Sequence, residues 1–239
     1  MVKYALITGA SGGIGSSTAL CLAEEGWNLY LHYHTNEKAI TELLHKIEKF
    51  GVKAIPIQAN LAQPREVVSL VDSIFQLDAI IYSSGNTSWG MFQDQTEEEV
   101  DDLINVHVKS PILLIQKLLP KLIERKGSIV MVSSIWGQIG GACEVVYSTV
   151  KGAQLAFVKS LSKELALSGV RINAIAPGAV ATSMMSSFSE GELEALQEEI
   201  PMGRLAQADE IADSIQFLTS AKSSYITGQT ISINGGWHT

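Results

Sequence analysis

Short, almost uninterrupted apolar runs alternate with longer amphipathic stretches along the whole chain, and this alternation restricts the possible folds more than any other feature. The apolar runs lack the in–out alternation of half-exposed strands, so they are typical of strands buried on both faces of a parallel sheet. Strands are predicted at 4–8, 28–33, 53–58, 79–83, 128–133, 170–176 and 230–233, and helices at 15–26, 37–50, 64–75, 97–125, 147–168 and 207–220. This order favours right-handed crossovers and predicts a doubly wound α/β sheet of about seven parallel strands.

No linker or internal repeat divides the 239 residues, so a single domain over 1–239 is expected. Its nucleotide-binding half is predicted at about 1–130 and its catalytic and substrate half at about 131–239. The segment 181–202, rich in Ser and Met and then acidic, interrupts the strand–helix order. It is interpreted either as a mobile lid over a substrate site or as a pair of surface helices.

Composition and charge exclude several classes of function. The net charge is −8, and no basic cluster extends beyond 124–126, so nucleic acid is not an expected partner. No apolar run reaches the roughly eighteen residues of a membrane span, so no membrane partner is expected. The two cysteines, Cys21 and Cys143, form neither a C-x-x-C pair nor a zinc pattern, which favours a reducing compartment and no metal. We therefore expect a cytoplasmic protein.

A glycine-rich turn, TGASGGIG at 8–15, lies between the first predicted strand and the first predicted helix. Glycines let the backbone approach a pyrophosphate, and the helix N-terminus favours its negative charge. The spacing G-x-x-x-G-x-G differs from the six-residue G-x-G-x-x-G pattern. The candidate cofactor-binding residues here are Gly9, Ser11, Gly12, Gly13, Ile14 and Gly15.

The same turn also fits the G-x-S-x-G pattern of hydrolases, which would make Ser11 a nucleophile. That elbow normally follows several strands, because an oxyanion loop has to come earlier in the chain. Too few residues precede Gly9 for such a loop, so this alternative is disfavoured. It predicts ester cleavage that depends on Ser11 and no binding of a nicotinamide cofactor.

Tyr147 and Lys151 are four residues apart near the start of a predicted helix, so their side chains share one face. A lysine ammonium favours the phenolate and lowers the tyrosine pKa from about 10, which would suit a general acid or base. Ser134 ends a buried strand, where its hydroxyl could bind a substrate carbonyl. The alternatives are a solvated helix face for the pair and a loop-capping role for the serine.

Taken together, these motifs resemble the short-chain dehydrogenase/reductase family over the whole chain and in the same order: TGASGGIG, Asn105, Ser134, Tyr147-x-x-x-Lys151, Pro177-Gly178 and Asn234-Gly235-Gly236. The resemblance implies a single Rossmann-like domain, a nicotinamide cofactor, and assembly as a homotetramer or homodimer. It also implies that Tyr147 donates the proton, Ser134 holds the carbonyl and Lys151 binds the nicotinamide ribose. Asn105 would anchor a water molecule of the proton relay.

Further cofactor contacts follow from the same resemblance. Asn60 and Leu61 would lie beside the adenine, with Asn60 in place of the usual Asp, and Thr182 would contact the carboxamide. The family's Asn-Asn-Ala-Gly sequence is replaced here by Tyr-Ser-Ser-Gly at 82–85, so the side-chain support of the sheet must differ. The remaining implied contacts are Tyr147, Lys151, Ser84, Gly85, Pro177, Gly178 and Val180.

The residues after the second predicted strand indicate which nicotinamide cofactor is used. NAD-binding proteins generally place a carboxylate there for the ribose diol, and 31–38 reads LHYHTNEK, with no acid at the strand end. His34 and Thr35, together with Asn36 and Lys38, could bond a 2′-phosphate. NADP(H) is therefore predicted over NAD(H), although Gly12 stands where many NADP-binding relatives carry a basic residue.

Two narrower resemblances concern the ketone substrate, whether a small molecule or a group attached to a protein. GRLAQADEIADSIQFL and SSYITGQTISINGG resemble the 3-oxoacyl-[acyl-carrier-protein] reductases. Those reductases attract an acidic carrier through two basic residues; Arg125 matches the first, and Ser168 replaces the second. The segment 133–154, with Ser83-Ser84-Gly85 and the terminal GGWH, resembles the reductases of the 5-aminopentanone modification on translation elongation factor P.

Glu144 and Trp136 are the candidate residues for selecting between these substrates, beside Ser134 and Tyr147. A carboxylate at 144 that faces the pocket would attract a cationic ketone, and the indole at 136 could stack on an ammonium-bearing chain. The alternative is that Glu144 points to solvent or to a neighbouring subunit. A nucleotide-sensing regulator without chemistry is a further alternative, which the intact Ser134, Tyr147 and Lys151 disfavour.

Overall fold

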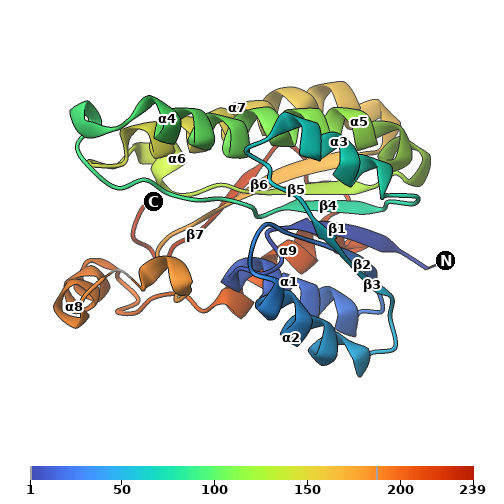
Figure 1. Cartoon of the computed structure of the whole chain (residues 1–239), viewed down its shortest axis with the longest axis horizontal. Helices are drawn as coiled ribbons and strands as arrows, with labels where there is room; N and C mark the ends of the chain where they lie inside the picture. Colours follow the sequence, from blue (N-terminus) through green and yellow to red (C-terminus); the bar gives the residue numbers. More distant parts are fainter. Residues whose placement is uncertain (1, 187) are drawn as a thin grey trace.

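The computed structural model describes residues 2–186 and 188–239, and they form an α/β fold around one seven-stranded sheet (Figure 1). All neighbouring strands are parallel, in the order β3-β2-β1-β4-β5-β6-β7. The strands are β1 (Tyr4–Thr8), β2 (Asn28–Tyr33), β3 (Ala54–Gln58), β4 (Ala79–Tyr82), β5 (Ser128–Val132), β6 (Arg171–Pro177) and β7 (Thr230–Ile233). The predicted doubly wound sheet is confirmed, with each strand boundary within one residue of the expected position.

Helices cover both faces of the sheet (Figure 1). On one face, α1, α2 and α9 pack over an apolar cluster that includes Leu22, Ile40 and Ile215. On the other, α3, α4, α5 and α7 lie together (Figure 1), and the cluster beneath them includes Leu114 and Leu155. The helices are α1 (Gly13–Glu24), α2 (Glu37–Glu48), α3 (Pro64–Asp72), α4 (Glu97–Ile104), α5 (Ser110–Arg125), α6 (Trp136–Ile139), α7 (Val145–Leu165), α8 (Glu190–Glu199) and α9 (Ala208–Thr219).

The single helix predicted over 97–125 is wrong in one respect, because a π-helical turn, η2 (Asn105–Lys109), separates α4 from α5. Pro111 explains part of this interruption, since proline has no N–H to donate to the carbonyl of His107, four residues earlier. That carbonyl instead accepts a hydrogen bond from Nε2 of Gln154 on α7 at 2.9 Å. Such π-turns are frequent at functional sites.

The segment 181–202 contains a short 3-10 turn, η4 (Ser183–Met185), followed by α8. No residue of α8 is buried, and the helix stands away from the sheet at the end of the molecule where the C-terminus lies (Figure 1). Helix α6 was not predicted because it is short, whereas α8 agrees with the surface-helix interpretation of this segment. No helix in the described part of the chain is long and apolar enough to cross a membrane.

Candidate active site

The glycine-rich turn joins β1 directly to α1, as predicted, and its backbone is tightly packed. Gly9 has a φ of +68°, and a Cβ there would lie 2.9 Å from the Cα of Ser84. A Cβ on Gly15 would lie 2.2 Å from the carbonyl oxygen of Gly9. The turn therefore requires glycine at both positions. The first N–H groups of α1, which follow this turn, have no carbonyl partner within the helix.

His32, on β2, holds this turn from behind and was not predicted as a site residue. Its Nδ1 accepts a hydrogen bond from the N–H of Gly9 at 3.1 Å, and its Nε2 donates to the carbonyl of Ala59 at 3.0 Å. Burial lowers the pKa of His32 to about 4, so the imidazole is neutral at pH 7. A polar residue inside the apolar run of β2 was the one sequence signal that could have indicated this role.

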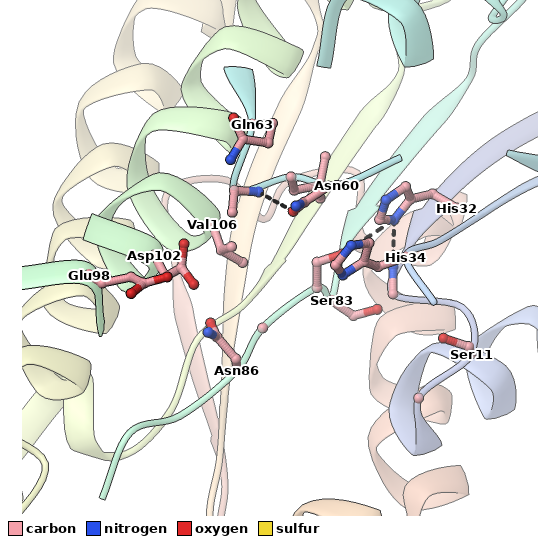
Figure 2. A pocket seen from close by; sticks show the side chains of 16 residues that line it. Ser11, His32, His34, Asn60, Gln63, Ser83, Asn86, Glu98, Asp102 and Val106 are labelled. Atoms are coloured by element: carbon pink, nitrogen blue, oxygen red, sulfur yellow. Dashed lines mark hydrogen bonds between the residues drawn. The ribbon is translucent and has the colours of Figure 1, made fainter. Parts of the chain in front are cut away.

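A cavity of about 470 Å³ lies in front of the turn, where β1 to β4 end (Figure 2). Thr35 was predicted to bind the cofactor but is exposed and lines neither this cavity nor the second one described below. The predicted cofactor residues that do line the first cavity are Gly9, Ser11, Gly12, His34, Asn60, Leu61, Ser84 and Gly85. The lining residues that were not predicted are His32, Ala62, Gln63, Ser83, Asn86, Glu98, Asp102 and Val106.

Of the four polar residues expected near a 2′-phosphate, His34 lines this cavity. The side chain of Asn36 instead caps α2 by accepting from the N–H of Ala39 at 3.1 Å. Lys38 lies 4.0 Å from Glu42 on the exposed face of the same helix. Figure 2 places His34 across the cavity from two carboxylates of α4, Glu98 and Asp102. The end of β2 itself carries no acid.

A second cavity of about 350 Å³ lies at the carboxyl ends of β5 and β6 and brings together three of the four predicted catalytic residues, Ser134, Tyr147 and Lys151. Ser83 lines both cavities, so the two adjoin. Gly13 lies just outside, where a Cβ would come within 2.4 Å of Thr182. The predicted residues that line the second cavity are Ile14, Ser134, Trp136, Glu144, Tyr147, Lys151, Pro177, Gly178, Val180 and Thr182.

Tyr147 and Ser134 are both buried and are hydrogen-bonded through their side chains. The oxygen of Ser134 also accepts from the N–H of Trp136 at 3.2 Å, which fixes the hydroxyl at the start of α6. Burial raises the pKa of Tyr147, the Glu144 carboxylate raises it further, and the bond to Ser134 opposes both effects. Tyr147 is therefore protonated at neutral pH, the state in which a phenol can donate a proton.

Lys151 is not among the groups that shift the pKa of Tyr147 in this structure, so its predicted lowering of that pKa stays a prediction. Its Nζ lies 5.4 Å from the centre of the tyrosine ring and donates to the carbonyl of Val132 at 2.9 Å. Burial lowers the pKa of Lys151 itself to about 7. A lysine that is only partly charged at neutral pH stabilises a phenolate less than a full ammonium would.

Asn105, the fourth predicted catalytic residue, opens the π-turn η2 and lines neither cavity. The turn is held in place by Tyr82, whose hydroxyl donates to the carbonyl of Val106 at 2.5 Å. His107, in the same turn, packs edge-on against the ring of Tyr147, with the ring centres 5.7 Å apart. Tyr82 thus supplies the altered support that the Tyr-Ser-Ser-Gly sequence predicts.

Glu144 is the residue before α7 and faces the second cavity, not bulk solvent. The hydroxyl of Thr87 donates to its Oε1 at 3.0 Å, and the side chain of Trp136 is also hydrogen-bonded to it. Burial raises the pKa of Glu144, and these two hydrogen bonds oppose that shift. The carboxylate is therefore half-buried beside Tyr147, and the cavity wall is acidic.

Comparison with known proteins matches almost the whole chain. Residues 9–238 match the family described as Enoyl-(Acyl carrier protein) reductase. The chain is 53% identical over 241 residues to the uncharacterized oxidoreductase YmfI of Bacillus subtilis (strain 168), with 100% of both proteins covered. It is 36% identical over 243 residues to the 3-oxoacyl-[acyl-carrier-protein] reductase FabG of Staphylococcus aureus (strain Mu50 / ATCC 700699), covering 100% of this chain and 99% of FabG.

Solved structures give the same result. The angucycline C-6 ketoreductase LanV with bound NADP superposes with a TM-score of 0.93 at 29% identity, over 98% of this chain and 95% of LanV. A short-chain type dehydrogenase/reductase from Mycobacterium marinum superposes with a TM-score of 0.91 at 30% identity, over 98% of this chain and 95% of that chain. The chain belongs to the short-chain dehydrogenase/reductase family and is an oxidoreductase. The hydrolase alternative is therefore wrong, and Ser11 lines the first cavity.

Among the described residues, no group of three or more His, Cys, Asp or Glu side chains is placed to hold a metal ion.

Proposed function

We propose that the protein reduces a ketone to a secondary alcohol with NADP(H). The observation that carries this proposal is the meeting of Ser134, Tyr147 and Lys151 in a cavity that adjoins the glycine-rich turn. Two adjoining cavities on either side of the turn suit an extended dinucleotide whose pyrophosphate lies against the N-terminus of α1. We propose His34 as a contact to the 2′-phosphate, and the NADP bound to LanV supports this choice.

Each residue has a role that its surroundings suit. NADPH, when bound, supplies the hydride for the carbonyl carbon. The hydroxyl of Ser134 donates a hydrogen bond to the ketone oxygen, and Tyr147 gives that oxygen its proton. Lys151 holds the nicotinamide ribose, and we propose that Asn105 anchors a relay water. The product is the secondary alcohol.

For the substrate, we propose a ketone that carries an amine, specifically the 5-aminopentanone modification on elongation factor P. A half-buried carboxylate at Glu144 favours a cationic substrate and disfavours an anionic one. Reduction of 3-oxoacyl groups on acyl carrier protein, the activity named for the FabG relatives, is the second candidate. Against it, Arg125 is already paired with Asp78 at 3.0 Å, and Ser168 replaces the second basic residue.

The remaining expectations belong to the same proposal. The protein would act in the cytoplasm as a homotetramer or homodimer. The segment 181–202, with the exposed helix α8, would act as the lid of the substrate half.

The charge argument is tested by comparing Glu144→Gln with the wild-type protein on an aminoketone and on a neutral ketone of equal length. We expect a loss of about tenfold or more in kcat/KM for the aminoketone and little change for the neutral ketone. A matched control is Glu198→Gln on α8, which removes an exposed carboxylate that does not line the cavity. Equal losses on both ketones would contradict the role of Glu144 in substrate choice.

A further inference from the structure

Three of the four tryptophans in the chain line the second cavity, which contains Ser134 and Tyr147, although they come from three separate segments. Trp89 lies in the loop after β4, Trp136 begins α6, and Trp237 lies in the C-terminal tail. The fourth, Trp27, packs in the core on the side of α1 and α2. Clustering of this kind is not expected from chance placement of a rare residue, and only Trp136 was predicted to be there.

The C-terminal tail holds Trp237 firmly against Trp136. Their ring centres are 5.4 Å apart and their planes meet at 65°. The backbone N–H of Trp237 donates to the carbonyl of Asn234 at 3.1 Å, and Nδ2 of Asn234 donates to the carbonyl of His238 at 2.7 Å. A Cβ on Gly178 would touch the indole at 3.4 Å, so the ring packs directly on the loop after β6.

Trp89 stands at the mouth of the cavity and is 72% exposed. Its loop is tied to the loop before α7 by a hydrogen bond from the N–H of Gly90 to the carbonyl of Cys143 at 2.9 Å. The mouth therefore brings an indole close to the segment that carries Glu144. This contact also gives Cys143, which has a φ of +61°, a structural role that the sequence did not suggest.

The charges around the three indoles are mostly negative. Glu144 and Glu199, the last residue of α8, both line the cavity, and Lys151 is the one basic residue among the described lining residues. Lys151 is buried and already donates to Val132. None of the ion pairs in the described part of the chain involves Glu144 or Glu199. Glu199 is exposed, but Glu144 is half-buried, and a half-buried carboxylate without a cation is costly, so a cationic ligand would remove that cost.

We propose that Trp89, Trp136 and Trp237, together with Glu144 and Glu199, form a cage that binds an alkylammonium group of the ketone substrate. This inference rests on the proposed reductase function and adds Trp237 and Glu199 as residues that determine specificity. The face of an indole ring attracts a cation more strongly than other aromatic side chains do, and the attraction grows when water is excluded. The binding of an acyl chain would be favoured by the apolar surface of the indoles alone, and the two carboxylates would not contribute to it.

The test uses two ketones of the same shape that differ in charge. (4-Oxopentyl)trimethylammonium carries the cation, and 6,6-dimethylheptan-2-one replaces its nitrogen with carbon. We expect wild-type kcat/KM to favour the cation by about tenfold or more. Trp237→Leu and Glu199→Gln should each reduce this ratio severalfold, because the cationic ketone loses more kcat/KM than the neutral ketone does. Trp237→Phe should retain part of the preference, and Glu198→Gln, next to Glu199 but outside the cavity, should retain all of it.

A second measurement is independent of turnover. Pentyltrimethylammonium should alter the tryptophan fluorescence of the wild-type protein in a saturable way, and hexanoate at the same concentrations should not. Saturation should be weakened by Trp237→Leu, with the thermal midpoint of the variant reported alongside to show that it is folded. Equal reduction of the two ketones, or equal binding of the cation and the anion, would overturn the cage and leave the reductase standing. Cation binding without reduction of either ketone would overturn the reductase instead.

Discussion

The buried lysine of the reaction centre should make the protein less stable than an uncharged residue would. Lys151 is 4% exposed, and burial lowers its pKa from 10.5 to about 7. Above pH 10.5 the side chain is neutral in both the folded and the unfolded chain. As the pH falls from 10.5 to 7, the unfolded chain takes up this proton before the folded one, so stability is lost across that window.

The shift sets the size of the effect. Each pKa unit corresponds to about 1.4 kcal/mol, so the lysine costs about 4 kcal/mol at pH 7 and about 2 kcal/mol at pH 9. Replacing it by the apolar Met, of similar length, removes the titration. The carbonyl of Val132 loses its donor in the variant, but that loss is the same at both pH values. The free energy of unfolding of Lys151→Met should therefore exceed that of the wild-type protein by about 2 kcal/mol more at pH 7 than at pH 9.

Urea unfolding of the cofactor-free protein at pH 7, 8 and 9 measures this difference, at one fixed protein concentration because assembly also contributes to stability. The range avoids the buried histidines His32 and His107, whose pKa values of about 4 and 3 affect stability only under acid conditions. Lys163→Met, at an exposed position on the same helix, is the control and should show no dependence on pH. An advantage of Lys151→Met that is constant from pH 7 to 9 would refute the reasoning.

Three further predictions concern the cofactor and the chemistry. Tyr147→Phe should lower kcat for ketone reduction by about 100-fold or more, a much larger effect than on the Kd for NADPH, measured by fluorescence; unchanged function in cells would revive the regulator alternative. His34→Asp should shift the ratio of kcat/KM for NADPH over NADH by about tenfold or more towards NADH, and an unchanged ratio would contradict the phosphate contact. Gly15→Ala should weaken NADPH binding about tenfold or more in calorimetry, because its Cβ would lie 2.2 Å from the Gly9 carbonyl oxygen; binding at wild-type strength would mean that the turn can relax.

The strands could be predicted because parallel strands covered on both faces must be apolar along their whole length. Elements without such a signal were harder to predict. The bounds of α8 were not predicted because it buries none of its residues, and the π-turn was missed because it depends on Pro111 together with the tertiary bond from Gln154 to His107. The reaction centre was predictable because Tyr147 and Lys151 are four residues apart on one helix. Local spacing is therefore sufficient where the contact itself is local.

The walls of the substrate cavity were harder to predict because they are assembled from distant segments. Trp237 contacts Trp136, although β6 and β7 lie between them in the sequence, and Trp89 lines the same cavity from the loop after β4. The orientation of Glu144 was left open by the sequence, and its burial depends on Thr87, which lies 57 residues away. Likewise, the sign of the pKa shift of Tyr147 follows from burial, which no local pattern reveals.

The most direct test of the proposed function is turnover of NADPH with the two candidate substrates side by side. Elongation factor P carrying the 5-aminopentanone group and a 3-oxoacyl group on acyl carrier protein would be compared at equal concentrations, with absorbance of NADPH as the signal. We predict that kcat/KM is higher for the aminoketone by about tenfold or more, and that Glu144→Gln removes most of this preference. Equal turnover of the two substrates, or a preference for the acyl carrier protein, would contradict the proposal.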